Sequence, residues 1–367
     1  MGLDRRGLAA LTCAVVVIVA MACASGAAGP GGPPASATAA ATAARAQAGG
    51  AAVPSAAPAP QTMKFADVPS IALAPLYVGL EQGYFAAEGL DLQLEPVAGG
   101  ADAVAMLGTG QLDANAGAVS AGTFNALQRG VDIRIVAPMS FLPAKGGASP
   151  LLVRKDLADQ VHSPADMKGR KVAINVRGGA NEYLLTKALA RGGLTLDDVE
   201  VVILPFPDVP QALAQDAVDF AIPAEPFATR AIEAGGAATF IESIAPGLMN
   251  TVVFFGGPFY RDRPAAAQGF VTALMRAARD LQGDAAKSDE HLRILAKYTH
   301  VSADVLRASV FNAWDPDLTI AKDDLMDQQL VLIQHGRTEL TQPLPIDRVV
   351  DERFQAAALA RLGPARR

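Results

Sequence analysis

The pattern of apolar and polar positions changes period repeatedly beyond residue 62. The stretch LDLQLE at 90–95 alternates leucine with polar residues, which is typical of a strand with one face in water. The apolar stretch ADAVAML at 101–107 follows and predicts a helix. The same pattern predicts strands at 64–68, 90–97, 113–117 and 133–137 and helices at 72–82, 101–109 and 120–129. This order favours a doubly wound, mostly parallel sheet, with the half-exposed strand 90–97 at its edge.

A second run of the same kind begins near residue 150. It predicts strands at 150–153, 172–174, 199–204 and 220–223 and a helix at 181–190. Segment 99–122 aligns without a gap with segment 205–228, 106 residues later, so Asp113 falls opposite Asp219 and Ser120 opposite Pro226. This repeat predicts two similar α/β lobes.

The rest of the chain predicts one strand at 251–256, followed by helices. The helices are expected at 265–281, 290–297, 303–311, 323–335 and 348–362, and they would return to cover the first lobe. The chain would then cross between the lobes twice, near 145–150 and 245–252. We therefore expect lobe 1 to comprise residues 62–148 and 250–367, and lobe 2 to comprise residues 149–249.

The first 61 residues predict an export leader and a tether. Arg5 and Arg6 precede a short apolar run, so residues 1–22 read as a secretory signal peptide. Residues 23–61 are rich in Ala, Gly, Pro, Ser and Thr, which predicts a disordered tether. Cys23 follows Ala22 as in a lipoprotein lipobox and would be lipidated, the alternative being cleavage without a lipid. The protein is then expected in the periplasm or on the outer face of the cytoplasmic membrane.

Composition removes several classes of function. The formal charge is −6 and there is no basic stripe, which argues against a nucleic-acid partner. Cys13 and Cys23 both lie in or next to the leader, so the predicted fold has no thiol, disulfide or cysteine metal ligand. The four histidines are far apart, and no nucleophile elbow, Walker loop or dinucleotide fingerprint occurs. We expect a monomeric protein that binds a small molecule, with no cofactor, no metal and no catalysis.

Several loops at predicted strand ends are candidate ligand contacts. Gly99-Gly100 would bring backbone amides close to a ligand at a helix start, the alternative being a plain turn. Pro69-Ser70 ends the first strand in the same way. Ser120 is either an N-cap or a ligand contact.

Lobe 2 offers the corresponding loops. The candidate residues Arg177, Gly178, Gly179 and Asn181 combine a guanidinium, backbone amides and a carboxamide, which together can hold a carboxylate or sulfonate. Glu225 could accept hydrogen bonds from a ligand or lock a hinge. Phe206, together with Phe255 from the first lobe, could line an apolar wall, the alternative for each being core packing.

These motifs give the chain a family resemblance. PLYV at 75–78, EQGYF at 81–85, EGLD at 88–91, GQLD at 110–113, LADQVHSPADMKG at 157–169 and AEPF at 224–227 carry it. The chain resembles ABC-transporter solute-binding proteins of the nitrate/sulfonate/taurine and thiamine-pyrimidine-precursor type. The resemblance implies a two-lobed, type II periplasmic-binding-protein-like fold with two hinge crossings, which closes on a small organic solute and delivers it to a membrane permease. It also implies that the loops holding that solute contain Pro69-Ser70, Gly99-Gly100, Ser120, Gly178–Asn181 and Glu225.

Two other functions would use the same expected cleft between the two lobes. One is an enzyme of the pyrimidine or thiamine-precursor type, but that branch depends on a cysteine-rich motif that this sequence lacks. The other is a sensor ectodomain, which would signal to a kinase in place of a permease. The combination of Arg177 with loop amides favours an anionic, sulfonate- or carboxylate-like solute for the binding protein.

Overall fold

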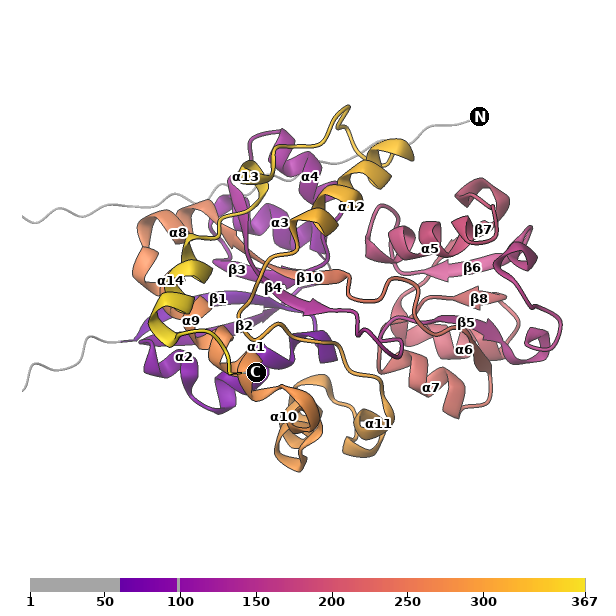
Figure 1. Ribbon diagram of the computed structural model, residues 1–367, viewed down its shortest axis with the longest axis horizontal. Helices are drawn as coiled ribbons and strands as arrows, with labels where there is room; N and C mark the ends of the chain where they lie inside the picture. The colour runs from indigo at the N-terminus through magenta and orange to yellow at the C-terminus, as the bar shows by residue number, and fades with distance from the viewer. Residues whose placement is uncertain (1–59, 98–99, 367) are drawn as a thin grey trace, which may run out of the picture. The chain divides into compact units, whose positions relative to one another are not determined.

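The computed structural model describes residues 60–97 and 100–366. Within this part of the chain, two five-stranded sheets each have their own hydrophobic core (Figure 1). The leader, nearly all of the tether, Cys23 and Gly99 lie outside the described residues, so the expectations for them stay predictions. No helix in the described part of the chain is long and apolar enough to cross a membrane.

The first sheet has the order β2-β1-β3-β10-β4. Its strands are β1 (Gln61–Asp67), β2 (Leu90–Pro96), β3 (Ala114–Gly117), β4 (Ile133–Phe141) and β10 (Met249–Gly256). β1 pairs in parallel with β2 and β3, and β10 runs antiparallel between β3 and β4. β2 is an edge strand, as its alternating sequence predicted, because an edge strand keeps one face in water.

The second sheet has the order β7-β6-β8-β5-β9. Its strands are β5 (Leu151–Arg154), β6 (Lys171–Ile174), β7 (Glu200–Ile203), β8 (Phe220–Ala221) and β9 (Ala237–Ile241). The chain passes from the first sheet to the second after β4 and returns before β10. The expected fold class, with two lobes, mostly parallel sheets and two crossings, is thereby confirmed.

Helices cover both faces of the first sheet, and we call this unit lobe 1. One face packs against α1 (Ala74–Glu81), α9 (Pro264–Asp280) and α10 (Asp289–Thr299), and the other packs against α3 (Gly100–Thr109), α4 (Ala121–Gln128) and α12 (Lys322–Gln334). The other α-helices of this lobe are α2 (Tyr84–Ala87), α8 (Gly257–Asp262), α11 (Ala303–Ala308), α13 (Ile346–Val349) and α14 (Arg353–Leu362). Helices of the C-terminal tail therefore cover the first sheet.

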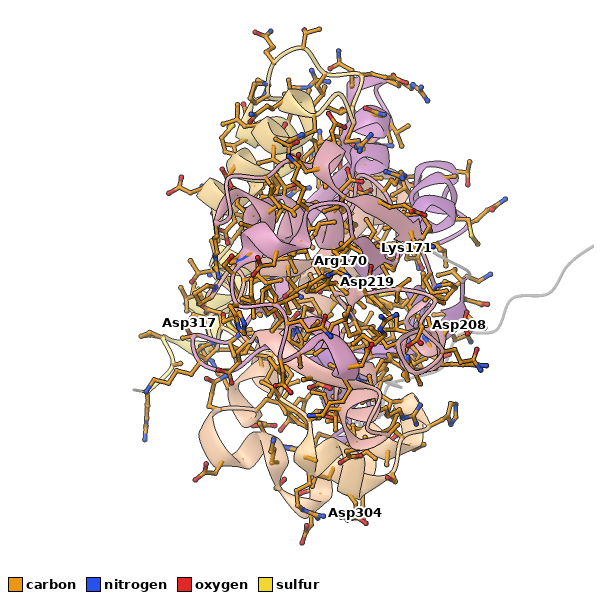
Figure 2. The ribbon with its side chains drawn as sticks, turned by 90° about the vertical axis from the view of Figure 1, so that its right-hand side faces the viewer. Arg170, Lys171, Asp208, Asp219, Asp304 and Asp317 are labelled. Atoms are coloured by element: carbon orange, nitrogen blue, oxygen red, sulfur yellow. The ribbon has the colours of Figure 1, made fainter. Side chains whose placement is uncertain are left out.

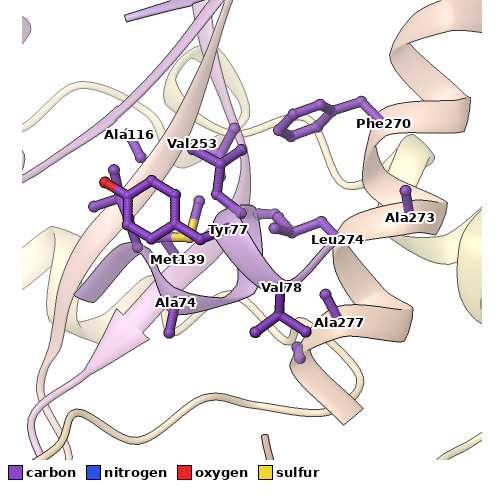
Figure 3. Close-up of a cluster of buried hydrophobic side chains, with 14 of the residues drawn as sticks. Ala74, Tyr77, Val78, Ala116, Met139, Val253, Phe270, Ala273, Leu274 and Ala277 are labelled. Atoms are coloured by element: carbon purple, nitrogen blue, oxygen red, sulfur yellow. The ribbon is translucent and has the colours of Figure 1, made fainter. Parts of the chain in front are cut away.

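The core under α9 shows why these segments form helices. Phe270, Ala273, Leu274 and Ala277 recur at spacings of three and four residues, so they lie along one face of α9. Figure 3 shows this face packed against Tyr77 and its neighbours on α1 and on the sheet. Each of the four α9 side chains is fully removed from water, so burial of this apolar face stabilises the helix.

Lobe 2 consists of the second sheet and three helices. α5 (Ala180–Ala190) covers one face, and α6 (Val209–Ala214) and α7 (Phe227–Glu233) cover the other (Figure 1). The internal repeat predicted a helix start at Pro226, which is the N-cap of α7. β9 was not predicted from the sequence, since short apolar segments carry little periodicity.

One predicted helix is wrong in its extent. The segment 348–362 is divided into α13 and α14, because Val350 adopts an extended conformation and forms a β-bridge with Ile135. The amide of Asp351 donates to the carbonyl of Ile135 over 2.9 Å. A backbone contact to β4 therefore outweighs the helical pattern at this point.

The aspartates of the internal repeat make the same contacts in both lobes. Asp113 accepts a hydrogen bond from the amide of Lys64 over 2.8 Å, and Asp219 accepts one from the amide of Lys171 over 2.9 Å. Each aspartate amide also donates to the carbonyl of the same lysine over 3.0 Å. Figure 2 labels Lys171 and Asp219, which lie side by side. The alignment of these two positions is therefore confirmed.

Candidate functional site

One hydrogen bond joins the facing loops of the two lobes. The amide of Ala121, the first residue of α4, donates to the carbonyl of Gly178 over 2.8 Å. Gly178 has a φ of +65°, and a Cβ built on it would lie 2.9 Å from the Cβ of Ala121. A glycine is therefore required for both the backbone conformation and the close approach. The preceding Ser120 is the N-cap of α4 and accepts from the amide of Thr123 over 3.3 Å.

The loop that opens α5 follows the carboxyl end of β6. Gly179 is the N-cap of α5, and Asn181 is buried with its carboxamide donating to the carbonyl of Ile222 over 2.6 Å. Asn181 thus ties this loop to the end of β8. Its side-chain donor is used inside lobe 2, which supports a role in shaping the loop.

Arg177 is exposed and extends away from this loop. Its guanidinium donates to the carbonyl of Val201 over 3.2 Å. Val201 lies on β7, the edge strand, and pairs with Val172 rather than with the last residue of β6. The guanidinium therefore reaches back along the sheet edge, and the structure does not bring it to Ser120 or Gly178.

Two phenylalanines form a stacked pair at the carboxyl ends of β7 and β8. The ring of Phe206 lies 6.3 Å from that of Phe227, with an interplanar angle of 28°. Both side chains are half-buried, so part of each ring remains open to a ligand. Phe227 was not among the predicted site residues, although it follows Glu225-Pro226 directly.

Glu225 is buried at the start of α7 and contacts both lobes. Its carboxylate accepts from the amide and hydroxyl of Thr229 over 3.1 and 3.0 Å, and from the amide of Val310 over 3.3 Å. Burial raises the pKa of Glu225, and these hydrogen bonds partly oppose the shift. Val310 belongs to the tail of lobe 1, so Glu225 makes a contact between the two lobes, and its role in binding or in a hinge stays a prediction.

Lobe 1 has a hollow of about 370 Å³ at the carboxyl ends of β1 and β2. It is lined by Asp67, Pro69, Leu94, Pro96, Lys297, Tyr298 and His300. Burial raises the pKa of Asp67, while a hydrogen bond from the hydroxyl of Tyr77 over 2.8 Å opposes the shift. Ser70 is half-buried next to this hollow and is the N-cap of a short 3₁₀ turn without a side-chain hydrogen bond.

Among the residues lining this hollow, sequence reasoning predicted only Pro69 as a site residue. Asp67 could have been found, because it ends the same strand that leads to Pro69. Lys297, Tyr298 and His300 come from the end of α10, more than 200 residues away along the chain. Only the folded arrangement brings them to this edge of the sheet.

Two other predicted site residues, Phe255 and Gly100, belong to lobe 1. Phe255 is fully buried in the core of lobe 1, where its ring meets those of Phe259, Phe270 and Phe354. Core packing was the alternative offered for this residue, and the structure gives it that place. Gly100 is the first residue of α3. Gly99 lies outside the described residues.

Two carboxamide oxygens near the strand ends have no hydrogen-bond partner within the described part of the chain. They are the Oδ1 atoms of Asn115 on β3 and of Asn175, directly after β6. Asn115 is only 3% exposed. Buried acceptors of this kind normally have a donor, so both are candidates to receive an N–H or O–H group from a solute.

A larger hollow of about 590 Å³ lies elsewhere in lobe 1, between segments 281–287 and 311–314. None of the predicted site residues lines it. Among the described residues, no group of three or more His, Cys, Asp or Glu side chains could hold a metal ion.

Comparison with known families gives one match over most of the fold. Residues 70–286 match the family model described as NMT1/THI5 like. The riboflavin-binding protein RibY of Chloroflexus aurantiacus is 31% identical over 188 residues, which are 47% of this chain and 50% of the relative. The chain therefore spans about half the length of this curated relative.

Solved structures share the fold at low sequence identity. The periplasmic nitrate-binding protein NrtA from Synechocystis PCC 6803 has a TM-score of 0.70 and 16% identity, with 83% of this chain and 90% of that chain covered. The desulfurization enzyme DszB has a TM-score of 0.57 and 20% identity, with 82% and 99% covered. Other similar structures include proteins named as sulfonate-binding proteins and the ligand-binding component of an ABC-type import system from Staphylococcus aureus.

Proposed function

Because the chain belongs to the NMT1/THI5-like family, we propose that it is the solute-binding component of an ABC importer. It would hold a small organic solute between its two lobes and deliver it to a membrane permease. The resemblance found in the sequence is confirmed at the level of the family. The import role, the solute and the permease belong to the proposal.

The observation that carries the proposal is the contact between Ala121 and Gly178. In open α/β sheets, ligands bind beyond the carboxyl ends of the strands. Here the loops beyond β3 and β6 belong to different lobes and meet through one hydrogen bond of 2.8 Å. A solute held by such loops would be enclosed by movement of the lobes about the two crossings.

The geometry favours a flat, uncharged ring system as the solute. The half-buried rings of Phe206 and Phe227 offer an aromatic surface, and the free acceptor of Asn175 suits a ring N–H. The likeness to a protein named for riboflavin binding supports this class. The anionic solute predicted from the sequence is the second candidate, and it depends on Arg177 turning from Val201 toward the cleft.

Titration of the purified protein with riboflavin, taurine and nitrate tests the proposal. Riboflavin should bind with a dissociation constant that the variant Phe206→Ala, which removes one ring of the pair, weakens at least tenfold. The control Phe240→Ala removes a ring that packs against the lobe 2 core, so it should lower stability without this selective loss. Binding of taurine alone would favour the anionic candidate, and binding of none of the three would contradict both solute classes.

An enzyme with the same fold is the alternative function. DszB is an enzyme of similar structure, but the described residues include neither a cysteine nor a cluster of potential metal ligands. Incubation with a bound solute, followed by mass spectrometry, distinguishes the two functions. A binding protein returns the solute unchanged, whereas stoichiometric or catalytic conversion would favour the enzyme. A sensor role would require a kinase partner in place of the permease.

Export and anchoring at Cys23 complete the proposal. The apolar run before Ala22-Cys23 supports a cleaved leader, and the Ala/Gly/Pro-rich segment after it would separate the fold from the membrane. Cys23→Ala should release the protein from the membrane fraction into the soluble fraction. Unchanged fractionation would favour simple cleavage without a lipid.

A further inference from the structure

A cluster of side chains holds α12 of lobe 1 against α5 of lobe 2. Asp327 on α12 accepts a hydrogen bond from the hydroxyl of Tyr183 and forms an ion pair of 2.8 Å with the ammonium group of Lys187. These two hydrogen bonds lower the pKa of Asp327 although burial acts in the opposite direction. Tyr183 and Lys187 both belong to α5, so one carboxylate joins two turns of the facing helix.

Arg337 makes a second connection three residues after α12 ends. Its Nε lies 2.5 Å from Oε1 of Glu182, whose side chain is only 3% exposed. The second oxygen of Glu182 has no partner within the described part of the chain. Loss of Arg337 would leave a buried carboxylate without its counter-charge, which is costly. We call Asp327, Arg337, Glu182, Tyr183 and Lys187 the α12–α5 clasp.

Apolar packing shows that α12 belongs to both lobes. Leu325 and Leu332 lie in the core of lobe 1, while Val331 packs against the core of lobe 2. The sequence predicted that this helix covers the first lobe, and it did not predict the contact with the second. α12 is therefore placed to fix the separation of the lobes.

The clasp lies next to the contact between the candidate ligand loops. Glu182 and Tyr183 are in the first turn of α5, which the loop containing Gly178 opens. A Cβ on Gly178 would lie 2.9 Å from Ala121 and 3.8 Å from the Cβ of Arg337. The clasp and the Ala121–Gly178 hydrogen bond thus share the same segment of lobe 2.

We propose that Asp327 and Arg337 are positioning residues of the solute site. They hold the α5 loop against the N-terminus of α4 without being ligand contacts themselves. This inference rests on the proposed function for its effect on solute affinity, but not for its effect on the lobes. Breaking the clasp would let the Ala121–Gly178 hydrogen bond open more often.

Hydrogen exchange of the Ala121 amide measures this directly. The first amides of a helix have no partner within the helix, so protection at Ala121 reports the bond to Gly178. Asp327→Ala should speed exchange of this amide at least tenfold. The matched control Arg129→Gln breaks the exposed ion pair with Glu339 inside lobe 1 and should leave it unchanged. Tyr183→Phe, which removes one hydroxyl, is the second variant if Asp327→Ala fails to fold.

Riboflavin and taurine titrations supply an independent readout. Asp327→Ala should lower the affinity for whichever probe the parent protein binds by at least threefold, whereas Arg129→Gln should not. Faster exchange at Ala121 without binding of either probe would support the clasp and count against the proposed solutes. An unprotected Ala121 amide in the parent protein, or equal exchange in Asp327→Ala and Arg129→Gln, would overturn the inference.

Discussion

Lobe 1 and lobe 2 place an aspartate at equivalent points, directly before β3 and directly before β8. Asp113 and Asp219 each join two neighbouring strands through a pair of backbone contacts. The helices that follow these strands begin differently. α4 is capped by Ser120. In the first turn of α7, the amide of Thr229 donates to Glu225, a buried carboxylate that also accepts from the amide of Val310 in the tail. The repeated part is therefore the scaffold, and the loops beyond it differ.

The tail accounts for a second difference between the lobes. Residues from α10 cover the carboxyl ends of β1 and β2 and help to form the 370 Å³ hollow. In lobe 2, the carboxyl ends of β7 and β8 instead have the half-buried pair Phe206 and Phe227. Two similar lobes thus offer a polar, charged surface on one side and an aromatic surface on the other.

The largest expected effects on stability come from replacing each of the two equivalent aspartates, and the loss should differ between the lobes. Asp113→Ala leaves the amide of Lys64 without an acceptor and takes the carboxylate partner from Arg263, so we expect a loss of about 2–4 kcal/mol in the free energy of unfolding. Asp219→Ala should cost about 1–2 kcal/mol, because Arg154 retains Asp156 at 2.7 Å. Urea unfolding followed by tryptophan fluorescence and circular dichroism measures both. Equal losses would contradict the difference in surroundings.

A methyl group between the lobes should have the next largest effect. Gly178→Ala places a Cβ against Ala121, so solute affinity should fall at least tenfold, or about 1.4 kcal/mol. Gly193→Ala is a matched control in lobe 2, since its φ is +69° and nothing lies within 4 Å. It shares the backbone strain but not the clash. Ala121→Gly in the Gly178→Ala background should restore part of the affinity, and no recovery would argue against this contact.

The sequence predicted the scaffold well because its periodicity is local. Strand β2 and helix α9 follow directly from alternating or three-to-four spacing of apolar residues, and the Asp113–Asp219 equivalence follows from one gapless alignment. Arg177 could not be placed in this way, because the direction of a long side chain depends on the acceptor it finds. In this structure that acceptor is the carbonyl of Val201 at the sheet edge. Contacts between α12 and α5 likewise depend on tertiary packing.

Asp67, in the hollow of lobe 1, should make the free energy of unfolding depend on pH. The Phe206–Phe227 pair of lobe 2 has no titratable group and should make no such contribution. Since the pKa of Asp67 is raised above 3.8 in the fold, its contribution to stability is present below pH 3.8 and is lost as pH rises through the raised value. Asp67→Asn keeps an acceptor for Tyr77 and removes the charge. The variant should therefore match the parent near pH 3.5 and gain on it at higher pH, by roughly 1.4 kcal/mol per unit of the shift. Urea unfolding from pH 3.5 to 7.5 tests this, and a constant difference would contradict it.

The smallest effect is expected at Arg177, and it decides between the two solute classes. The side chain is exposed and makes one hydrogen bond, to Val201, so Arg177→Ala should change the free energy of unfolding by no more than about 0.5 kcal/mol. Riboflavin affinity should stay within about twofold of the parent, because an uncharged ring gains little from a guanidinium that points along β7. Titration calorimetry of Arg177→Ala with riboflavin and with taurine measures the two affinities on the same protein. A selective loss of taurine binding would mean that the guanidinium turns into the cleft when an anion is present, and the sequence-based expectation of an anionic solute would then replace the flat, uncharged one.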